Sequence, residues 1–274
     1  MKTALSTLDL RRARTLSDAL TILADEPRVP IAGATDIYVQ LNFGTHPGRR
    51  FLDIWGIEEL KTITVSNDTL VFGALATWAS MLASRDVADR LPMMLEAARQ
   101  VGGRQIQNRG TIGGNIANGS PAGDSLPVLA AADAIVVLRS VSGERRVPLT
   151  ELYTGYRATV IRGDELIVAV EVPRVEGRQY FRKVGTRAAQ AISKVVVAAV
   201  RSTDGAPKIA VGSVAPTVVR LRDTERALGT GASLDDAMIA LRGEVHPIDD
   251  LRSTADYRLQ VTGNLVRRFW SETE

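Results

Sequence analysis

The chain has 274 residues, no cysteine, and 34 Lys and Arg residues against 31 Asp and Glu residues, for a formal charge of +3. Without cysteine it can form neither a disulfide nor a thiolate-ligated iron–sulfur cluster, and the small, dispersed charge excess does not predict a nucleic-acid partner. The N-terminal stretch lacks the apolar run of a signal peptide, and no window is long enough for a membrane span, so we expect a soluble, cytoplasmic protein.

The first 55 residues predict a βαβ-like unit. Apolar residues at helical spacing predict a helix over 15–24, and 29–31 reads as a short strand. The sequence AGATDI at 32–37 then predicts a tight turn and a helix start, followed by a strand over 50–54. A strand, a tight turn and a helix N-terminus can together present free backbone N–H groups to a phosphate.

The next part, residues 56–173, mixes sheet and helix. Its predicted elements are a hairpin of 61–65 and 69–75, helices over 77–84, 91–101 and 125–132, a hairpin of 134–139 and 144–147, and a strand over 166–172. Because that strand stops at Pro173 and a polar segment follows, we place a domain boundary there, between residues 1–173 and 174–274.

A glycine-rich stretch, residues 102–134, carries seven glycines among Asn, Ser, Thr and Gln. Glycine lets backbone N–H groups approach a ligand closely, and successive N–H groups in a turn make an anion-binding concavity. We interpret the stretch as a phosphate or pyrophosphate loop; the alternative is a long glycine-rich surface loop. Together with AGATDI at 32–37, it suggests two sides of a single diphosphate, although neither stretch has a familiar nucleotide-binding pattern.

The last hundred residues predict a small α+β domain. Its expected elements are three antiparallel strands over 180–184, 193–203 and 208–214, and two helices over 233–241 and 253–270. The fold class of the whole chain is therefore α+β.

These residues resemble the FAD-binding (medium) subunit of the molybdenum hydroxylases, the family of xanthine dehydrogenase and carbon monoxide dehydrogenase. The matching motifs follow the family order along nearly the whole chain: AGATDI at 32–37, QNRGTIGGNIANGSPAGDSLPVLAAADA at 107–134, GYR at 155–157, DELI at 164–167, FRKV at 181–184, AAQAISKVVVAAV at 188–200 and VAPT at 214–217. The specific part is TIGGN, followed nine residues after its Asn by Asp124. The family usually has a second glycine where this chain has Ala34, and alanine resists a positive φ by about 1 kcal/mol.

The resemblance implies a two-part FAD-binding domain of the PCMH type over 1–173, split into 1–55 and 56–173, followed by the C-terminal domain of carbon monoxide dehydrogenase flavoproteins over 174–274. FAD would lie extended between the two parts. Ala32–Thr35 and Thr111–Asn115 would hold its pyrophosphate, mainly through backbone N–H groups, and Val101 would pack beside it. The expected FAD-binding residues are Val29, Pro30, Ile31, Ala32, Gly33, Ala34, Thr35, Asp36, Val101, Thr111, Ile112, Gly113, Gly114, Asn115, Asp124, Leu166 and Lys183.

Three of these roles are specific to single side chains. Asp124 would accept a hydrogen bond from the ribose or adenine side; the alternative is a helix N-cap. Leu166 and Lys183 would reach the cofactor from later strands, and the alternative for Lys183 is an ordinary solvated lysine. Tyr156 either packs or contacts flavin or nicotinamide, and the three tryptophans, Trp55, Trp78 and Trp270, are interpreted as core or interface residues.

By the same resemblance the chain is an oxidoreductase subunit. Partner subunits would carry the molybdenum–pterin and two [2Fe–2S] clusters, in a dimer of heterotrimers, and electrons would pass from the clusters to the flavin and on to NAD⁺, oxygen or a quinone. We expect no catalytic acid, base or metal site here. The two histidines, His46 and His246, each precede a proline and stand in no ligand or nucleophile–base spacing, so we interpret them as surface or loop residues.

Two other functions stay open on the sequence. One is a stand-alone flavoprotein oxidoreductase with the same flavin fold, which would need a substrate acid or base that we do not find. The other is an assembly or scaffold subunit without cofactor, against which the intact TIGGN motif and Asp124 argue.

Overall fold

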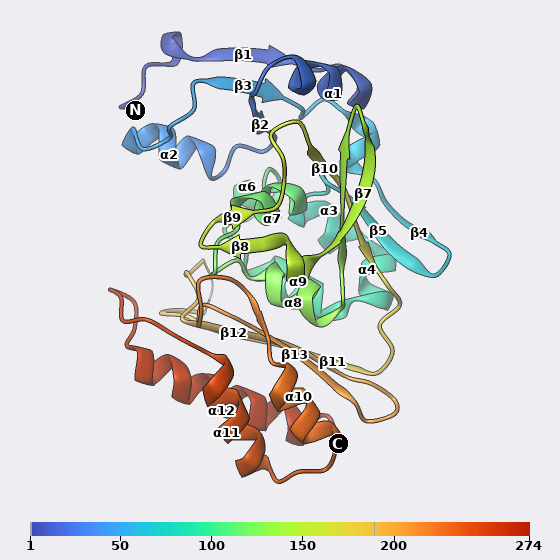
Figure 1. Cartoon of the computed structure of the whole chain (residues 1–274), viewed down its shortest axis with the longest axis vertical. Coiled ribbons are helices and arrows are strands. Elements are labelled where there is room, and N and C mark those ends of the chain that lie inside the picture. The colour runs from blue at the N-terminus through green and yellow to red at the C-terminus, as the bar shows by residue number, and fades with distance from the viewer. Residues whose placement is uncertain (1, 189) are drawn as a thin grey trace.

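The computed structural model describes residues 2–188 and 190–274 and shows three parts stacked along the long axis (Figure 1). A small parallel sheet lies at one end, an antiparallel sheet with helices lies in the middle, and a second antiparallel sheet with the helices α10 (Arg222–Gly229), α11 (Leu234–Glu244) and α12 (Ala255–Glu272) lies at the other end. The mixture of helices and sheets confirms the α+β class.

The first part is a three-stranded parallel sheet in the order β1-β3-β2. Its elements are β1 (Asp9–Arg12), α1 (Leu16–Asp25), β2 (Val29–Ile31), α2 (Ile37–Phe43) and β3 (Arg50–Asp53), after the 3₁₀ turn η1 (Leu5–Thr7). The predicted βαβ-like unit is β2–α2–β3. We did not predict β1, because all its side chains are exposed and so leave no apolar alternation to read.

The central part is built on a five-stranded antiparallel sheet in the order β4-β5-β10-β6-β7. Its strands are β4 (Ile63–Ser66), β5 (Thr69–Gly73), β6 (Ile135–Ser140), β7 (Gly143–Pro148) and β10 (Leu166–Val172), with a separate small pair of β8 (Tyr153–Gly155) and β9 (Ala158–Thr159). Its helices are η2 (Glu58–Lys61), α3 (Trp78–Ala83), α4 (Arg85–Arg90), α5 (Pro92–Gln100), α6 (Arg104–Gln107), α7 (Ile112–Asn118), α8 (Ser125–Ala131) and α9 (Leu149–Leu152).

The middle strands of this sheet, β6 and β10, are covered on both faces, and alternate residues of a strand face opposite ways. Phe72 and Val170 belong to the core shared with α3, α5 and α8. Val137 and Val168 instead pack with α1 and β3 of the first part. The first part is therefore seated on one face of the central sheet, next to the strand β10.

The C-terminal part contains a four-stranded antiparallel sheet, not the three strands that we predicted. Its elements are β11 (Arg178–Val184), β12 (Val195–Arg201), β13 (Pro207–Gly212), β14 (Val219–Arg220), α10 (Arg222–Gly229), α11 (Leu234–Glu244) and α12 (Ala255–Glu272). The fourth strand, β14, has two residues and is too short for a period of two to show in the sequence. Helix α10 was also missed, because its sequence RDTERALG is dominated by charge.

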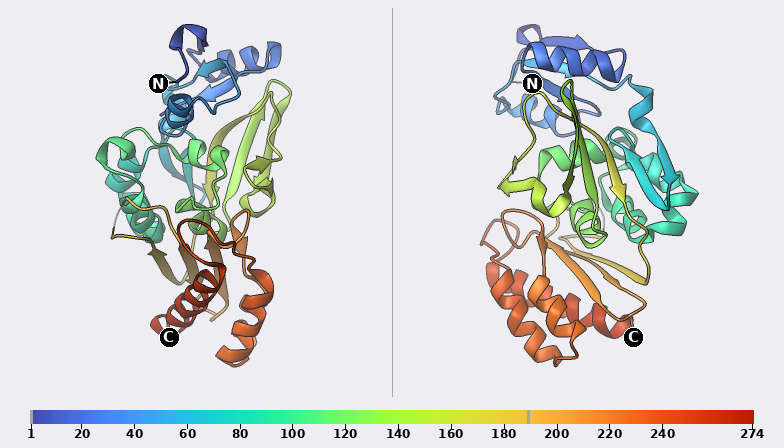
Figure 2. Two further views of the ribbon diagram at one scale, coloured as in Figure 1. Left: turned by 90° about the vertical axis from the view of Figure 1, so that its left-hand side faces the viewer. Right: turned by 45° about the vertical axis from the view of Figure 1, so that its right-hand side comes forward.

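The C-terminal sheet is sandwiched between the central helices and its own helices, as the two views of Figure 2 show. Alternate residues of β12 divide between the two sides: Val196 and Ala198 join the central core, whereas Val195 and Val197 pack against α10–α12. Since β12 is buried on both faces, it reads as one continuous apolar run.

The predicted domain boundary at residue 173 falls in the link between β10 and β11. Among the residues described, no helix combines the length and apolar character that a membrane crossing needs.

Candidate functional site

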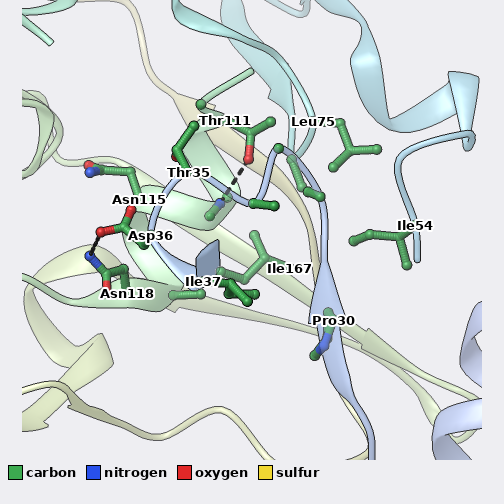
Figure 3. A pocket seen from close by; sticks show the side chains of 18 of the residues that line it. Pro30, Thr35, Asp36, Ile37, Ile54, Leu75, Thr111, Asn115, Asn118 and Ile167 are labelled. Atoms are coloured by element: carbon green, nitrogen blue, oxygen red, sulfur yellow. Dashed lines mark hydrogen bonds between the residues drawn. The ribbon is translucent and has the colours of Figure 1, made fainter. Parts of the chain in front are cut away.

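A pocket of about 560 Å³ lies between the first part and the central part. Its walls come from the turn after β2, from the N-terminal turn of α7, and from the segment that enters β10. Figure 3 shows the turn after β2 lying beside Thr111 and α7. Sites for small molecules and cofactors have volumes of roughly 300–1,000 Å³. The two turns predicted to hold one diphosphate thus line a single pocket.

The first turn, residues 32–36, keeps its backbone donors free. The N–H groups of Gly33, Ala34 and Thr35 make no hydrogen bond with any residue that the structure describes. Ala34 has φ 64°, which is the left-handed region where alanine carries the penalty expected above. Asp36 occupies the N-cap position of α2 without a capping hydrogen bond. Uncapped N–H groups at the start of a helix are suited to an anion.

The second turn is a helix start, not an open loop. Thr111 Oγ1 accepts a hydrogen bond from the N–H of Gly114 at 3.2 Å and caps α7. The N–H groups of Ile112 and Gly113 donate to the carbonyl oxygens of Ala76 and Ala74, just after β5, at 3.0 and 2.9 Å. The hydroxyl of Ser125 donates a hydrogen bond to Asn115 Oδ1 at 2.7 Å. This turn therefore turns its Thr111 and Asn115 side chains to the pocket, while its N–H groups at 112–115 bond within the chain.

The two turns touch at Gly33. A Cβ built on Gly33 would lie 1.6 Å from the carbonyl oxygen of Arg109, so only glycine allows this approach. The guanidinium of Arg109 lies over the ring of Trp55, 3.9 Å from its centroid. Arg109 thus contacts the first part through both its backbone and its side chain, and it brings the start of the second turn against the first.

Most residues expected to bind FAD line the pocket. These are Val29, Pro30, Ala32, Gly33, Ala34, Thr35, Asp36, Val101, Thr111, Gly113, Gly114, Asn115 and Leu166. Four do not line it: Ile31, Ile112, Asp124 and Lys183. Ile112 is fully buried in the central core. Lining a pocket does not test a binding role, so each of these roles stays a prediction.

Asp124 and Lys183 form a buried ion pair in a different place. Lys183 Nζ lies 2.5 Å from Asp124 Oδ2, and the two side chains are 5% and 8% exposed. The second oxygen, Oδ1, is buried without a partner among the described residues. Burial raises the pKa of Asp124 to about 6, although the charge and hydrogen bond of Lys183 act in the opposite direction. The alternative roles considered for these residues were a helix N-cap and a solvated lysine. Asp124 makes no capping hydrogen bond to α8, and Lys183 is buried.

The polar side of the pocket carries a chain of hydrogen bonds. Asn118 Nδ2 donates to Asp36 Oδ1 at 3.1 Å, and Arg157 Nη1 donates to the backbone oxygen of Asn118 at 3.2 Å. Asp36 is exposed at the edge of the cleft, yet desolvation by the cleft walls raises its pKa, while Arg157 and Asn118 lower it. Tyr156 is 64% exposed and does not line the pocket.

Sequence reasoning missed several lining residues, because they come from segments with no motif. Trp78 is buried, as interpreted, but also lines the pocket, with Ile54 and Leu75 nearby on the wall. His46 is neither exposed nor remote: it is 9% exposed, its ring lies 5.2 Å from that of Phe51, and it borders the pocket. Its burial depends on β3 folding over it, which no local pattern reports.

Among the described residues no group of three or more His, Asp and Glu could hold a metal ion.

Comparison with known proteins gives matches along almost the whole chain. Residues 6–175 match the family of the FAD binding domain in molybdopterin dehydrogenase, and residues 179–273 match the CO dehydrogenase flavoprotein C-terminal domain. The putative xanthine dehydrogenase FAD-binding subunit of Escherichia coli K12 is 30% identical over 95% of this chain and 94% of its own. The carbon monoxide dehydrogenase medium chain of Hydrogenophaga pseudoflava is 32% identical over 87% of this chain and 86% of its own.

Similarity extends to solved structures. The reconstituted CO dehydrogenase from Oligotropha carboxidovorans contains a chain with a TM-score of 0.91 and 26% identity. The match covers 98% of this chain and 97% of that one. The architecture of three stacked parts is therefore shared over its full length.

Proposed function

Because this chain belongs to the family of FAD-binding subunits of molybdopterin dehydrogenases, we propose that it is the electron-transfer subunit of a molybdenum hydroxylase. FAD as cofactor and the oxidoreductase class follow from the family itself. We propose that electrons reach the FAD from [2Fe–2S] clusters of a partner subunit and pass on to NAD⁺ or another acceptor. The resemblance of the motifs and the absence of cysteine from this chain support clusters on a partner.

The residues of the pocket fit FAD. The free N–H groups of Gly33, Ala34 and Thr35 suit an anionic diphosphate, because such donors would otherwise be left without partners in the cleft. Thr111 and Asn115 line the same pocket, beside this first turn. We propose that these two turns hold the pyrophosphate and that Val101 and Leu166 contact the cofactor. The sequence predicted backbone N–H donors from both turns, but those of 112–115 already bond within the chain, so the proposal takes backbone donors from the first turn and side chains from the second.

When bound, FAD supplies a group that can accept electrons singly and release them in pairs. The chain's own residues bind and orient that group and keep water from its inner face. The Asp124–Lys183 pair does not line this pocket, and the Oδ1 of Asp124 is buried without a partner among the described residues. Both keep their predicted role at the cofactor as part of this proposal.

The proposed assembly has a molybdopterin-binding large subunit and an iron–sulfur small subunit, arranged as a dimer of heterotrimers in the cytoplasm. The relatives named as a medium chain and as an FAD-binding subunit support the existence of partners. The observation that carries the proposal on this chain is the meeting of the two turns in one pocket, through the contact of Gly33 with Arg109.

The test is purification of the full chain together with its co-expressed genomic neighbours. We expect three subunits to co-elute at the mass of a dimer of heterotrimers, with a flavin spectrum near one FAD per chain. Reduced complex should be reoxidised by NAD⁺, oxygen or a quinone, and the fastest of these identifies the acceptor. A colourless chain that does not take up added FAD would refute the proposal, and a yellow chain that binds no partner would refute the assembly alone.

A further inference from the structure

The pocket has two chemically different sides, which Figure 3 shows. Thr35, Asp36 and Asn118 lie on one side of the first turn. Pro30, Ile54 and Leu75 lie on the other side, which is aliphatic and enclosed by β2, the end of β3 and the start of β10. The aliphatic side suits a flat ring whose faces need apolar cover. Polar atoms on the edge of such a ring need a hydrogen-bond partner when the ring is buried.

His46 is one of the polar residues that line the pocket, with Gln40, Arg162 and Glu165. Its ring lies beside Val29, since a Cβ on Gly48 would contact both the ring and Val29 Cγ2, at 3.1 and 3.0 Å. His46 Nδ1 lies 3.0 Å from the backbone nitrogen of Gly48 and 3.2 Å from its carbonyl oxygen. In the tautomer in which Nδ1 accepts from the shorter of these two contacts, the ring hydrogen is on Nε2.

The donor on Nε2 is uncommitted. It makes no hydrogen bond with the described residues, and it is not among their fully buried, unpartnered atoms. It therefore reaches open space, and the open space that His46 borders is the pocket. A buried imidazole whose Nδ1 is engaged by its own loop and whose Nε2 is uncommitted can donate from Nε2 to an acceptor atom on a ligand.

We propose that His46 recognises the adenine ring of FAD, with Nε2–H donating to a ring nitrogen, and so helps to select FAD over flavins that lack the adenosine diphosphate. This inference rests on the proposed function. Adenine matches the site because its faces are apolar and its edge carries acceptor nitrogens. The isoalloxazine ring does not suit this enclosed side, because it must exchange electrons with partners outside the chain.

The test compares ligands as well as variants, on the full chain. His46→Phe keeps a ring against Phe51 and removes the donor, and His246→Phe, at an exposed histidine of the C-terminal part, is the matched control. Affinities for FAD, FMN, ADP and inorganic pyrophosphate are measured by flavin fluorescence and calorimetry. We expect H46F to weaken FAD and ADP by about five- to tenfold, the value of one hydrogen bond, and to leave FMN and pyrophosphate unchanged. H46Q, which retains an N–H donor, should recover part of the loss.

Three results would overturn the inference. Unchanged ADP affinity in H46F would remove His46 from the adenine. A loss of FMN affinity with a shifted flavin spectrum would place the isoalloxazine at this end instead. An equal loss for all four ligands, with a lower melting temperature, would reduce His46 to a structural role. If the wild-type chain binds ADP but not FAD, the proposed function fails while the adenine site stands.

Discussion

Replacing Gly33 by alanine should separate the two turns that form the pocket. The new Cβ would lie 1.6 Å from the Arg109 carbonyl oxygen and 2.4 Å from its carbon, so one turn must retreat by more than an ångström. Backbone is stiff here, because Arg109 is also held by its stack on Trp55. That shift takes donors of the first turn out of hydrogen-bonding range of a diphosphate. Losing two bonds to a charged group costs about 3–6 kcal/mol, or roughly 100- to 10,000-fold in Kd.

The assay is FAD titration of the purified full chain, followed by flavin fluorescence and by the flavin content of the protein as isolated. Gly163→Ala is the matched control, since Gly163 lines the same pocket and its Cβ would meet nothing within 4 Å. Gly114→Ala is intermediate, because its Cβ would meet only the Thr111 hydroxyl, at 2.9 Å. We expect the loss of affinity to follow the order G33A, G114A, G163A. Wild-type affinity in G33A, or equal losses in all three, would refute the reasoning.

Three further predictions concern strain and charge. Ala34→Gly removes a left-handed penalty of about 1–2 kcal/mol and adds about 0.5–1 kcal/mol of chain entropy, so urea unfolding should show equal or slightly higher stability, and a clear loss would contradict the strain at Ala34. Burial raises the pKa of Asp124 from 3.8 to about 6, so this carboxyl stabilises the fold fully below about pH 4 and loses that contribution as the pH rises through 6. The unfolding free energy of wild type relative to D124N should fall by on the order of 3 kcal/mol over that range, and a pH-independent difference would count against it. Because the pKa of Asp36 is also raised and its ionised form would repel a diphosphate, FAD affinity should increase as the pH falls through that pKa; Kd measured at several pH values should be flatter in D36N, and identical profiles would rule out this repulsion.

Much of the secondary structure could be predicted because it is encoded locally. Residues 67 and 68 connect β4 and β5 with φ values of 46° and 63°, which Asn and Asp tolerate, and the flanking strands carry the expected alternation. The glycine-rich stretch was harder. Its TIGGN segment forms the capped helix α7, since Thr111 supplies the cap and Gly113 lets the helix approach Ala74, whose carbonyl oxygen would be 2.7 Å from a Cβ.

Residues that line the pocket divide in the same way. Most of those in the two turns were predicted to lie together, because glycine and capping residues signal a special backbone wherever they occur. His46 and Trp78 could not, because each reaches the pocket only through packing against distant strands. The pairing of Asp124 with Lys183 joins α8 to β11, and the unpartnered Oδ1 is a property of that junction alone.

The sequence by itself determined the family, the cofactor and the two turns, because these depend on short runs of residues whose backbone and hydrogen-bonding properties are local. Only the tertiary structure decided that the turns meet at Gly33 and Arg109, that a histidine next to a proline is buried beside the pocket, and that the C-terminal sheet has a fourth strand. Burial and contact arise between residues far apart in the chain, and a local pattern carries no record of which distant surface will cover it.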